Sequence, residues 1–343
     1  MSTIPGVSVP RAVGAALGLS VFALASLHAA AADVASIPLP DPVRWDYVSV
    51  DAPAHRLYVA HRARVDVVDI ITGKPVLQLS PTPGVHGAAA AADVGRVFTS
   101  NGGEDAVGVF DIASGREVGK VKVGHGPDAI VYEPVTHRVL AFNGHSSDVT
   151  AIDAASLRVL AASIPSPGRP EFAVVDGHGR VYFNIEDKNE LAVLDARTLK
   201  VERHYSLAPC DSPSGLAIDP GGRLYSVCEN GMLVVSDPTQ GKVIGQAAIG
   251  HGPDGVAWMD GKAWSANGQD GTISVVSETA PGHFESVATL QTARGARTIA
   301  ADPSLHRLFT PTADFKPQTA SDAGKKRPEA VPGSFRVLVV STR

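Results

Sequence analysis

Val65-Asp66-Val67-Val68-Asp69 is the clearest copy of a Val-rich strand that returns throughout the chain. The later copies are Val107–Asp111, Val149–Asp153, Leu191–Asp195, Leu233–Asp237, Ile273–Ser277 and Val337–Ser341. A second apolar strand precedes each copy, with landmarks at positions 57, 97, 139, 181, 224, 263 and 308, so the spacings run 40, 42, 42, 43, 39 and 45 residues. A repeat of about 40 residues made of short strands indicates propeller blades.

Each repeat supplies four short strands, and such a sheet buries both of its faces only by stacking against its neighbours. We therefore predict an all-β fold over residues 33–343, a seven-bladed β-propeller of four-stranded antiparallel blades. The chain ends after Val337–Ser341, which leaves blade 7 without a fourth strand. We predict that Ser36–Pro40 pairs with this last strand and closes the ring, so that no sheet edge stays open.

The N-terminus has a different composition from the repeats. Arg11 precedes the apolar run Ala12–Leu27, and small residues follow before Asp33. This pattern predicts a signal peptide over residues 1–32, cleaved near Ala29–Asp33, and a periplasmic or secreted protein without a membrane span after cleavage. The alternative is an uncleaved membrane anchor, because the apolar run approaches spanning length.

Charge and motifs narrow the classes of partner and cofactor. The chain has 35 acidic and 30 basic residues, a net charge of -5, so nucleic acid is not expected as a partner. Gly250–Gly255 fits G-x-G-x-x-G by letter but opens no helix, and the chain has no C-x-x-C-H motif, so neither NAD nor haem is expected. A quinone site is not supported either, because the Trp-rich blade motifs of quinoprotein alcohol dehydrogenases are missing and the only tryptophans are Trp45, Trp258 and Trp264. We also expect the protein to be a monomer.

A polar residue, whose type varies between repeats, opens the first strand of each repeat. These column residues are Asp46, His86, Asp128, Glu171, Ser214, Asp254 and Arg297. The second strand ends at a further polar set, Asn101, Asn143, Asn184 and Asn267, with His61 and Cys228 at the equivalent places. Because the strands alternate in direction, both sets should lie on one face of the disc, the top face, around the mouth of the central channel. We predict a ligand-binding site there.

The column residues fit three kinds of site. Crowded carboxylates raise one another's pKa or bind a cation. A divalent cation, Ca²⁺, Mg²⁺ or a transition ion, could therefore be held by Asp46, His86, Asp128, Glu171 and Asp254. Arg297 could pair with a carboxylate of the ring or bind one on a ligand. The interpretations left open are a hydrated polar channel, a metal site and an organic-ligand site.

Two local features remain. Cys210 precedes the first strand of the fifth repeat and Cys228 ends its second strand, so we predict a disulfide, with a reactive thiol or a metal pair as the alternative. Blade 7 carries one large insertion, Ala313–Ser334, on the top face. Its polar composition predicts a flap without a core, either a lid over the channel or a tolerated surface loop.

The repeat unit, with a D/E-P turn, an H/R-L/V-Y/F-V strand and a closing V-x-V-I/F-D strand, resembles the YVTN repeat. Asn184–Glu190, Cys210–Asp219 and Gly295–Thr298 are similar to segments of exported YncE-type seven-bladed propellers. The resemblance covers the chain after the signal peptide and implies the same fold. It does not fix the function, because lactonases, lyases and interaction scaffolds share that fold.

Two functions follow as hypotheses. The first is a non-enzymatic exported propeller that binds a small-molecule ligand or an exported partner protein on its top face. The alternative is a metal-assisted hydrolase or lyase of the lactonase type, with His86 as acid or base and Arg297 orienting the substrate. Lactonase-type propellers combine Glu, Asn and Asp ligands, whereas this column holds His and several Asp, which favours the binding function.

Overall fold

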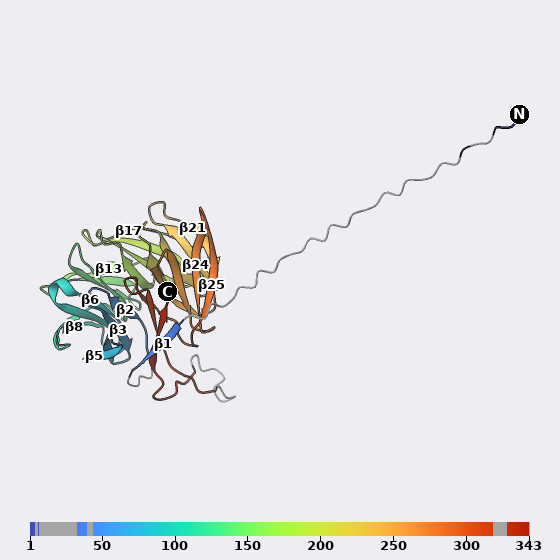
Figure 1. The fold of residues 1–343 in the computed structure, drawn as a ribbon. Coiled ribbons are helices and arrows are strands. Elements are labelled where there is room, and N and C mark those ends of the chain that lie inside the picture. The colour runs from blue at the N-terminus through green and yellow to red at the C-terminus, as the bar shows by residue number, and fades with distance from the viewer. Residues whose placement is uncertain (4–5, 7–32, 40–43, 318–327, 343) are drawn as a thin grey trace.

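The computed structural model describes residues 1–3, 6, 33–39, 44–317 and 328–342 of the chain. It shows seven four-stranded antiparallel sheets, which form the predicted seven-bladed propeller (Figure 1). The predicted signal peptide, residues 1–32, lies outside the described residues except for residues 1–3 and 6. None of the helices in the described part of the chain has the length and apolar character needed to cross a bilayer.

Blades 1 to 4 each run from the innermost to the outermost strand in chain order. Their strands are β2 (Val48–Asp51), β3 (Arg56–His61), β4 (Arg64–Asp69) and β5 (Lys74–Leu79); β6 (Val85–Ala91), β7 (Arg96–Asn101), β8 (Ala106–Asp111) and β9 (Glu117–Lys122); β10 (Pro127–Glu133), β11 (Arg138–Asn143), β12 (Asp148–Asp153) and β13 (Val159–Pro165); and β14 (Pro170–Val175), β15 (Arg180–Ile185), β16 (Glu190–Asp195) and β17 (Lys200–Ser206).

Blades 5 and 6 follow the same order, and blade 7 borrows its outermost strand from the N-terminus. Their strands are β18 (Pro213–Ile218), β19 (Leu224–Cys228), β20 (Met232–Asp237) and β21 (Lys242–Ala248); β22 (Pro253–Met259), β23 (Lys262–Asn267), β24 (Thr272–Ala280) and β25 (His283–Gln291); and β26 (Ala300–Asp302), β27 (Arg307–Thr312), β28 (Arg336–Ser341) and β1 (Asp33–Pro38). Every predicted Val-rich segment lies in the third strand of its blade, so the repeat assignment is confirmed.

Ring closure is confirmed, with different strand bounds. β1, blue in Figure 1, pairs antiparallel with β28 near the C-terminus. In this ladder Ile37 lies opposite Val337. The ladder begins at Asp33 rather than at the predicted Ser36, because its partner continues to Ser341 and offers three further pairing positions.

The hydrophobic core lies between the blades rather than in one central mass. Each pair of neighbouring blades encloses one cluster of buried apolar side chains among the described residues. Between blades 3 and 4, for example, the rings of Phe142 and Phe183 pack with centroids 5.1 Å apart. Ile37 and Leu39 are buried in the cluster that joins blades 7 and 1, so β1 contributes apolar burial as well as backbone hydrogen bonds.

Five of the seven innermost strands carry β-bulges near their top ends. In blade 3, Pro127 lies opposite Asn143 and Ile130 lies opposite Ala141, so three residue steps on β10 face two on β11. Equivalent register shifts occur in β6, β14, β18 and β22. A bulge bends the strand and redirects a side chain. Each of these bulges contains one column residue, so the irregularity lies where the predicted site begins.

The insertion of blade 7 is anchored at both ends. A backbone bridge pairs Phe315 with Ala330. The ring of Trp45 packs against Phe335 at 5.3 Å and against Phe315 at 6.1 Å between centroids. The expectation of a segment without a core is wrong for the start of the insertion, because Phe315 packs against the cluster between blades 7 and 1; Phe335, which directly follows the insertion, lies within that cluster. The middle of the insertion lies outside the described residues.

Candidate functional site at the channel mouth

Hydrogen bonds between neighbouring blades join the tops of the innermost strands. They are Tyr47 N to His86 O (3.0 Å), Asp254 N to Arg297 O (3.3 Å), Thr298 Oγ1 to Asp46 O (2.8 Å), Ser214 Oγ to Pro253 O (3.2 Å) and Asn184 Nδ2 to Ser214 O (2.8 Å). The column residues therefore stand on backbone that is tied across blades, which limits how far their side chains can move apart.

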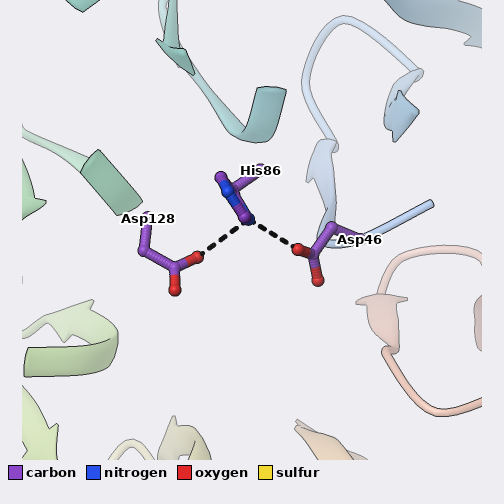
Figure 2. A group of neighbouring side chains, drawn as sticks. All are labelled: Asp46, His86 and Asp128. Carbon is purple, nitrogen blue, oxygen red and sulfur yellow. Dashed lines mark hydrogen bonds and ion pairs between the residues drawn. The ribbon is translucent and has the colours of Figure 1, made fainter. Parts of the chain in front are cut away.

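His86 lies between two carboxylates from the blades on either side (Figure 2). Its Nδ1 is 2.7 Å from Oδ2 of Asp46 and 3.3 Å from Oδ1 of Asp128. One potential ligand atom from each of these residues lies within 4.8 Å of the others. The structure thus brings together three of the five predicted metal ligands; Glu171 and Asp254 are not part of this group.

Arg297 bridges blades 6, 7 and 1. Its Nε donates to Oδ2 of Asp254 at 2.6 Å, and its Nη2 donates to the carbonyl of Trp45 at 3.0 Å and to Oδ1 of Asp46 at 3.3 Å. Burial lowers the pKa of this guanidinium, but Asp254 and Asp46 outweigh burial and raise it. Arg297 already donates hydrogen bonds to two carboxylates of the column. A substrate that Arg297 orients, as predicted, would have to compete with both of them.

Tyr47 is the residue of the site that the sequence analysis missed. Its hydroxyl donates to Oε1 of Glu171 at 3.0 Å, and its ring packs edge-on against Phe172 at 5.0 Å. It belongs to blade 1, while both partners belong to blade 4, so the buried side chain reaches across the axis. The sequence does single out Tyr47, because most repeats carry a small residue directly after the column residue, whereas blades 1 and 4 carry aromatic ones. The seven residues are Tyr47, Gly87, Ala129, Phe172, Gly215, Gly255 and Thr298.

Burial and mutual repulsion shift the ionisation of the carboxylates. Burial, followed by the charges of Asp128 and Asp254, raises the pKa of Glu171 well above its usual range. Burial also raises the pKa of Asp128 to about 7, although His86 acts against this shift. Burial lowers the pKa of His86, but its hydrogen bond to Asp46 and the charge of Asp128 raise it to about 8 overall. The channel mouth therefore holds protons at neutral pH that isolated side chains would release.

The asparagines lie below the mouth, within the blades. Asn101, Asn143, Asn184 and Asn267 are fully buried. Their amide groups donate to neighbours within the protein; Asn143, for example, donates to Asp148 at 2.8 Å. With no exposed surface they offer no atoms to a ligand at the mouth, and their hydrogen bonds hold the top loops in place.

The cysteine prediction is confirmed. Cys210 and Cys228 form a disulfide with a Cα–Cα distance of 5.4 Å, and both residues are buried. Cys228 stands where four other blades carry the asparagines. In blade 5 a covalent bond therefore joins the strand to the loop that enters β18, and it fits an oxidising compartment.

The pKa of Glu171 leads to a stability prediction. Glu171→Gln keeps an acceptor for Tyr47 but removes the ionisable group, so the variant should be more stable at pH 8 by about 1–3 kcal/mol. The folded pKa is raised, so the contribution of Glu171 to stability is fully present below the ordinary pKa of 4.5 and is lost as pH rises toward the raised value. Urea unfolding at pH 4 and pH 8 measures the difference, which should nearly vanish at pH 4.

The matched control is Glu285→Gln on the outer strand β25, where the carboxylate is 53% exposed. Its effect should stay within about 0.5 kcal/mol at both pH values. A stability difference for Glu171→Gln that is the same at pH 4 and pH 8 would contradict the raised pKa.

The fold and the site together define a WD40-like seven-bladed β-propeller with a network of charged side chains at the top ends of its innermost strands. The sequence model of the family described as outer membrane protein assembly factor BamB matches residues 103–305, more than half of the chain. The chain belongs to this family. No curated protein matches it in sequence.

Solved structures share the fold at low sequence identity. The structure of U3-55K aligns with a TM-score of 0.75 and 8% identity, covering 90% of this chain and 98% of that one. A chain of the mitotic checkpoint complex gives 0.70 and 13%, covering 98% and 99%. Hydrazine synthase from Kuenenia stuttgartiensis gives 0.66 and 15%, covering 79% and 92%. At these identities the likeness shows the fold alone.

Proposed function

We propose that this chain is an exported, non-enzymatic binding propeller, of the YVTN-repeat, YncE-like type, whose top face holds a ligand or a partner protein around the channel mouth. The observation that carries the proposal is the set of partly buried, mutually repelling carboxylates at the top ends of the innermost strands. Such an arrangement lowers stability. Proteins retain destabilising arrangements of this kind mainly at functional sites.

Export has separate support. The disulfide between Cys210 and Cys228 persists in an oxidising compartment, and the family to which the chain belongs is that of an outer membrane protein assembly factor. The N-terminal Arg11 and apolar run provide the sequence pattern of a secretory leader. We infer a periplasmic location for the mature protein.

The alternative, a metal-assisted hydrolase or lyase, rests on the cluster of Asp46, His86 and Asp128. In that mechanism His86 would serve as acid or base and Arg297 would orient the substrate. In the structure the Nδ1 of His86 faces both carboxylates, and Arg297 is bonded to Asp254 and Asp46. Both residues already have partners within the ring, so the geometry favours binding over catalysis.

Site-specific photo-crosslinking tests the binding surface. A photoreactive residue is placed at His145, Lys188 or Gln269, which are exposed on top-face turns of blades 3, 4 and 6, and at His178 on the opposite face as the control. The full chain, leader included, is expressed in its native host and recovered from the periplasm. Mass spectrometry of that material checks for a mature N-terminus near Asp33.

We expect one protein partner to be crosslinked from the top-face positions and not from His178. If the ligand is small, native mass spectrometry of the same preparation should show a bound molecule that is lost on unfolding. Equal crosslinking from both faces would refute the assignment of the top face. So would the absence of both a crosslinked partner and a bound molecule.

A further inference from the structure

We propose that Asp46, His86 and Asp128 form a binding site for one divalent first-row transition ion at the channel mouth. This goes beyond the proposed function, because the ion would bind whether or not a partner occupies the top face. The three side chains come from blades 1, 2 and 3 and converge on one point, as Figure 2 shows.

The donor spacing suits such an ion. Nδ1 of His86 lies 2.7 Å from Oδ2 of Asp46 and 3.3 Å from Oδ1 of Asp128. Ligands bound at about 2.0–2.2 Å around one ion are separated from each other by roughly 3 Å. Small side-chain adjustments within the 4.8 Å cluster would therefore bring all three atoms to the ion.

One oxygen of the cluster accepts no hydrogen bond. Oδ1 of Asp128 is a buried atom whose contact is the ion pair with Nδ1 of His86, at 3.3 Å, and it accepts no hydrogen bond within the part of the chain that the structure describes. Nδ1 of His86 lies closer to Asp46, at 2.7 Å. A buried carboxylate oxygen that accepts no hydrogen bond is unfavourable. An ion between the three side chains would supply a partner for this oxygen. The missing hydrogen bond is therefore evidence for an ion that is separate from the residue types in the cluster.

Surrounding residues hold two of the ligands in place. Nη2 of Arg297 donates to Oδ1 of Asp46 and leaves Oδ2 facing His86. The opposite edge of the imidazole packs against Gly102, where an added Cβ would come within 2.9 Å of Nε2 of His86. Contacts of this kind orient the ligands of metal sites. They fix Nδ1 as the nitrogen that faces the carboxylates.

The donor set selects the class of ion. Ca²⁺ and Mg²⁺ prefer sites made of oxygen ligands, whereas an imidazole with two carboxylates suits Mn²⁺, Co²⁺ or Zn²⁺. Two ionised carboxylates and a neutral imidazole also balance the charge of one divalent ion. We therefore expect Zn²⁺ and Mn²⁺ to bind at this site in preference to Ca²⁺.

Calorimetric titration of the chelator-treated mature protein with Zn²⁺, Mn²⁺ and Ca²⁺ measures this binding. Wild type should bind one equivalent of Zn²⁺ or Mn²⁺ at least tenfold more tightly than Ca²⁺. Asp128→Asn and His86→Gln, which conserve side-chain size, should each weaken Zn²⁺ binding at least tenfold. The matched control is His125→Ala, because His125 lies on the same face but contacts a single carboxylate, Asp105, at 2.9 Å.

Electron spin-echo spectroscopy of bound Mn²⁺ adds a readout that does not depend on affinity. The spectrum of wild type should show a coordinated imidazole nitrogen, and that signal should disappear in His86→Gln. Circular dichroism checks that each variant is folded. Gly102→Ala should weaken binding by displacing the imidazole, although position 102 supplies no ligand.

Two results would overturn the proposal. One is that the wild-type protein binds neither Zn²⁺ nor Mn²⁺ at millimolar concentration. Protonated His86, rather than a metal ion, would then hold the two carboxylates together. The other is equal loss of binding in His125→Ala and His86→Gln. Neither result bears on the top-face crosslinks, so this proposal and the proposed function fail separately.

Discussion

Arg297→Met is expected to lower the free energy of unfolding by about 3–5 kcal/mol at pH 8. Methionine preserves most of the apolar length of the side chain but removes its charge, which faces Asp254 at 2.6 Å and Asp46 at 3.3 Å. Asp254 would lose the guanidinium at 2.6 Å, and Asp46 would lose one of its two cationic neighbours while keeping His86 at 2.7 Å. Removing one partner of a buried ion pair is far more destabilising than removing an exposed pair, because an uncompensated charge stays behind. Urea unfolding of the mature protein measures this loss.

A second arginine on the top face provides the control. Arg169 pairs with Glu186 at 2.6 Å, but its side chain is 47% exposed, compared with 19% for Arg297. Solvent screens such a pair, so Arg169→Met should change stability by less than about 1 kcal/mol. Arg297→Lys should recover part of the loss, since a lysine keeps the charge without the planar fork. Similar losses for both methionine variants would mean that the ring does not depend on Arg297.

Ile37→Asp is expected to destabilise the propeller by about 4 kcal/mol or more and to expose the edge of blade 7. Ile37 is 6% exposed and packs in the cluster between blades 7 and 1, so aspartate would place an unpaired charge in that core. β1 is held by one neighbouring strand, β28, and would detach first. The strand left at the edge would then be open to pairing with another molecule.

Ala35→Asp lies two residues away on β1, where the side chain is exposed, and should be nearly neutral. Urea unfolding compares the two variants, and hydrogen exchange at the amides of β28 reports on detachment. Ile37→Asp should speed exchange at Val337 and its neighbours, while Ala35→Asp should not. Unchanged exchange in Ile37→Asp would show that β1 does not close the ring in solution.

The fold was predictable because the signal is local and repeated. The Val-rich strand occurs seven times at nearly constant spacing, and each copy independently indicates the same unit. The missing fourth strand of blade 7 indicated closure by the N-terminus, which β1 confirms. The bounds of β1 were less predictable, because they depend on how far its partner β28 extends. The packing at the start of the insertion was not predictable either, since Phe315 finds its apolar contact in Trp45, far away in the sequence.

Only part of the site was predictable. Aligning the repeats was enough to place seven different polar residues at the start of the innermost strands, and so at one end of the channel. The alignment could not show that bulges redirect His86 and Asp128, because a bulge depends on the register between paired strands. Nor could it show that Tyr47 crosses the axis to Glu171, because that contact needs the separation of opposite blades.

The sequence by itself therefore determined the blades and their number, and it placed one polar residue at the start of each innermost strand, because each follows from a pattern that repeats along the chain. The tertiary structure alone decided which of those residues meet. Asp46 contacts both His86, from the next blade, and Arg297, 251 residues later in the chain. Closing the ring places the last blade beside the first, and that closure brings the two ends of the sequence into one charged network.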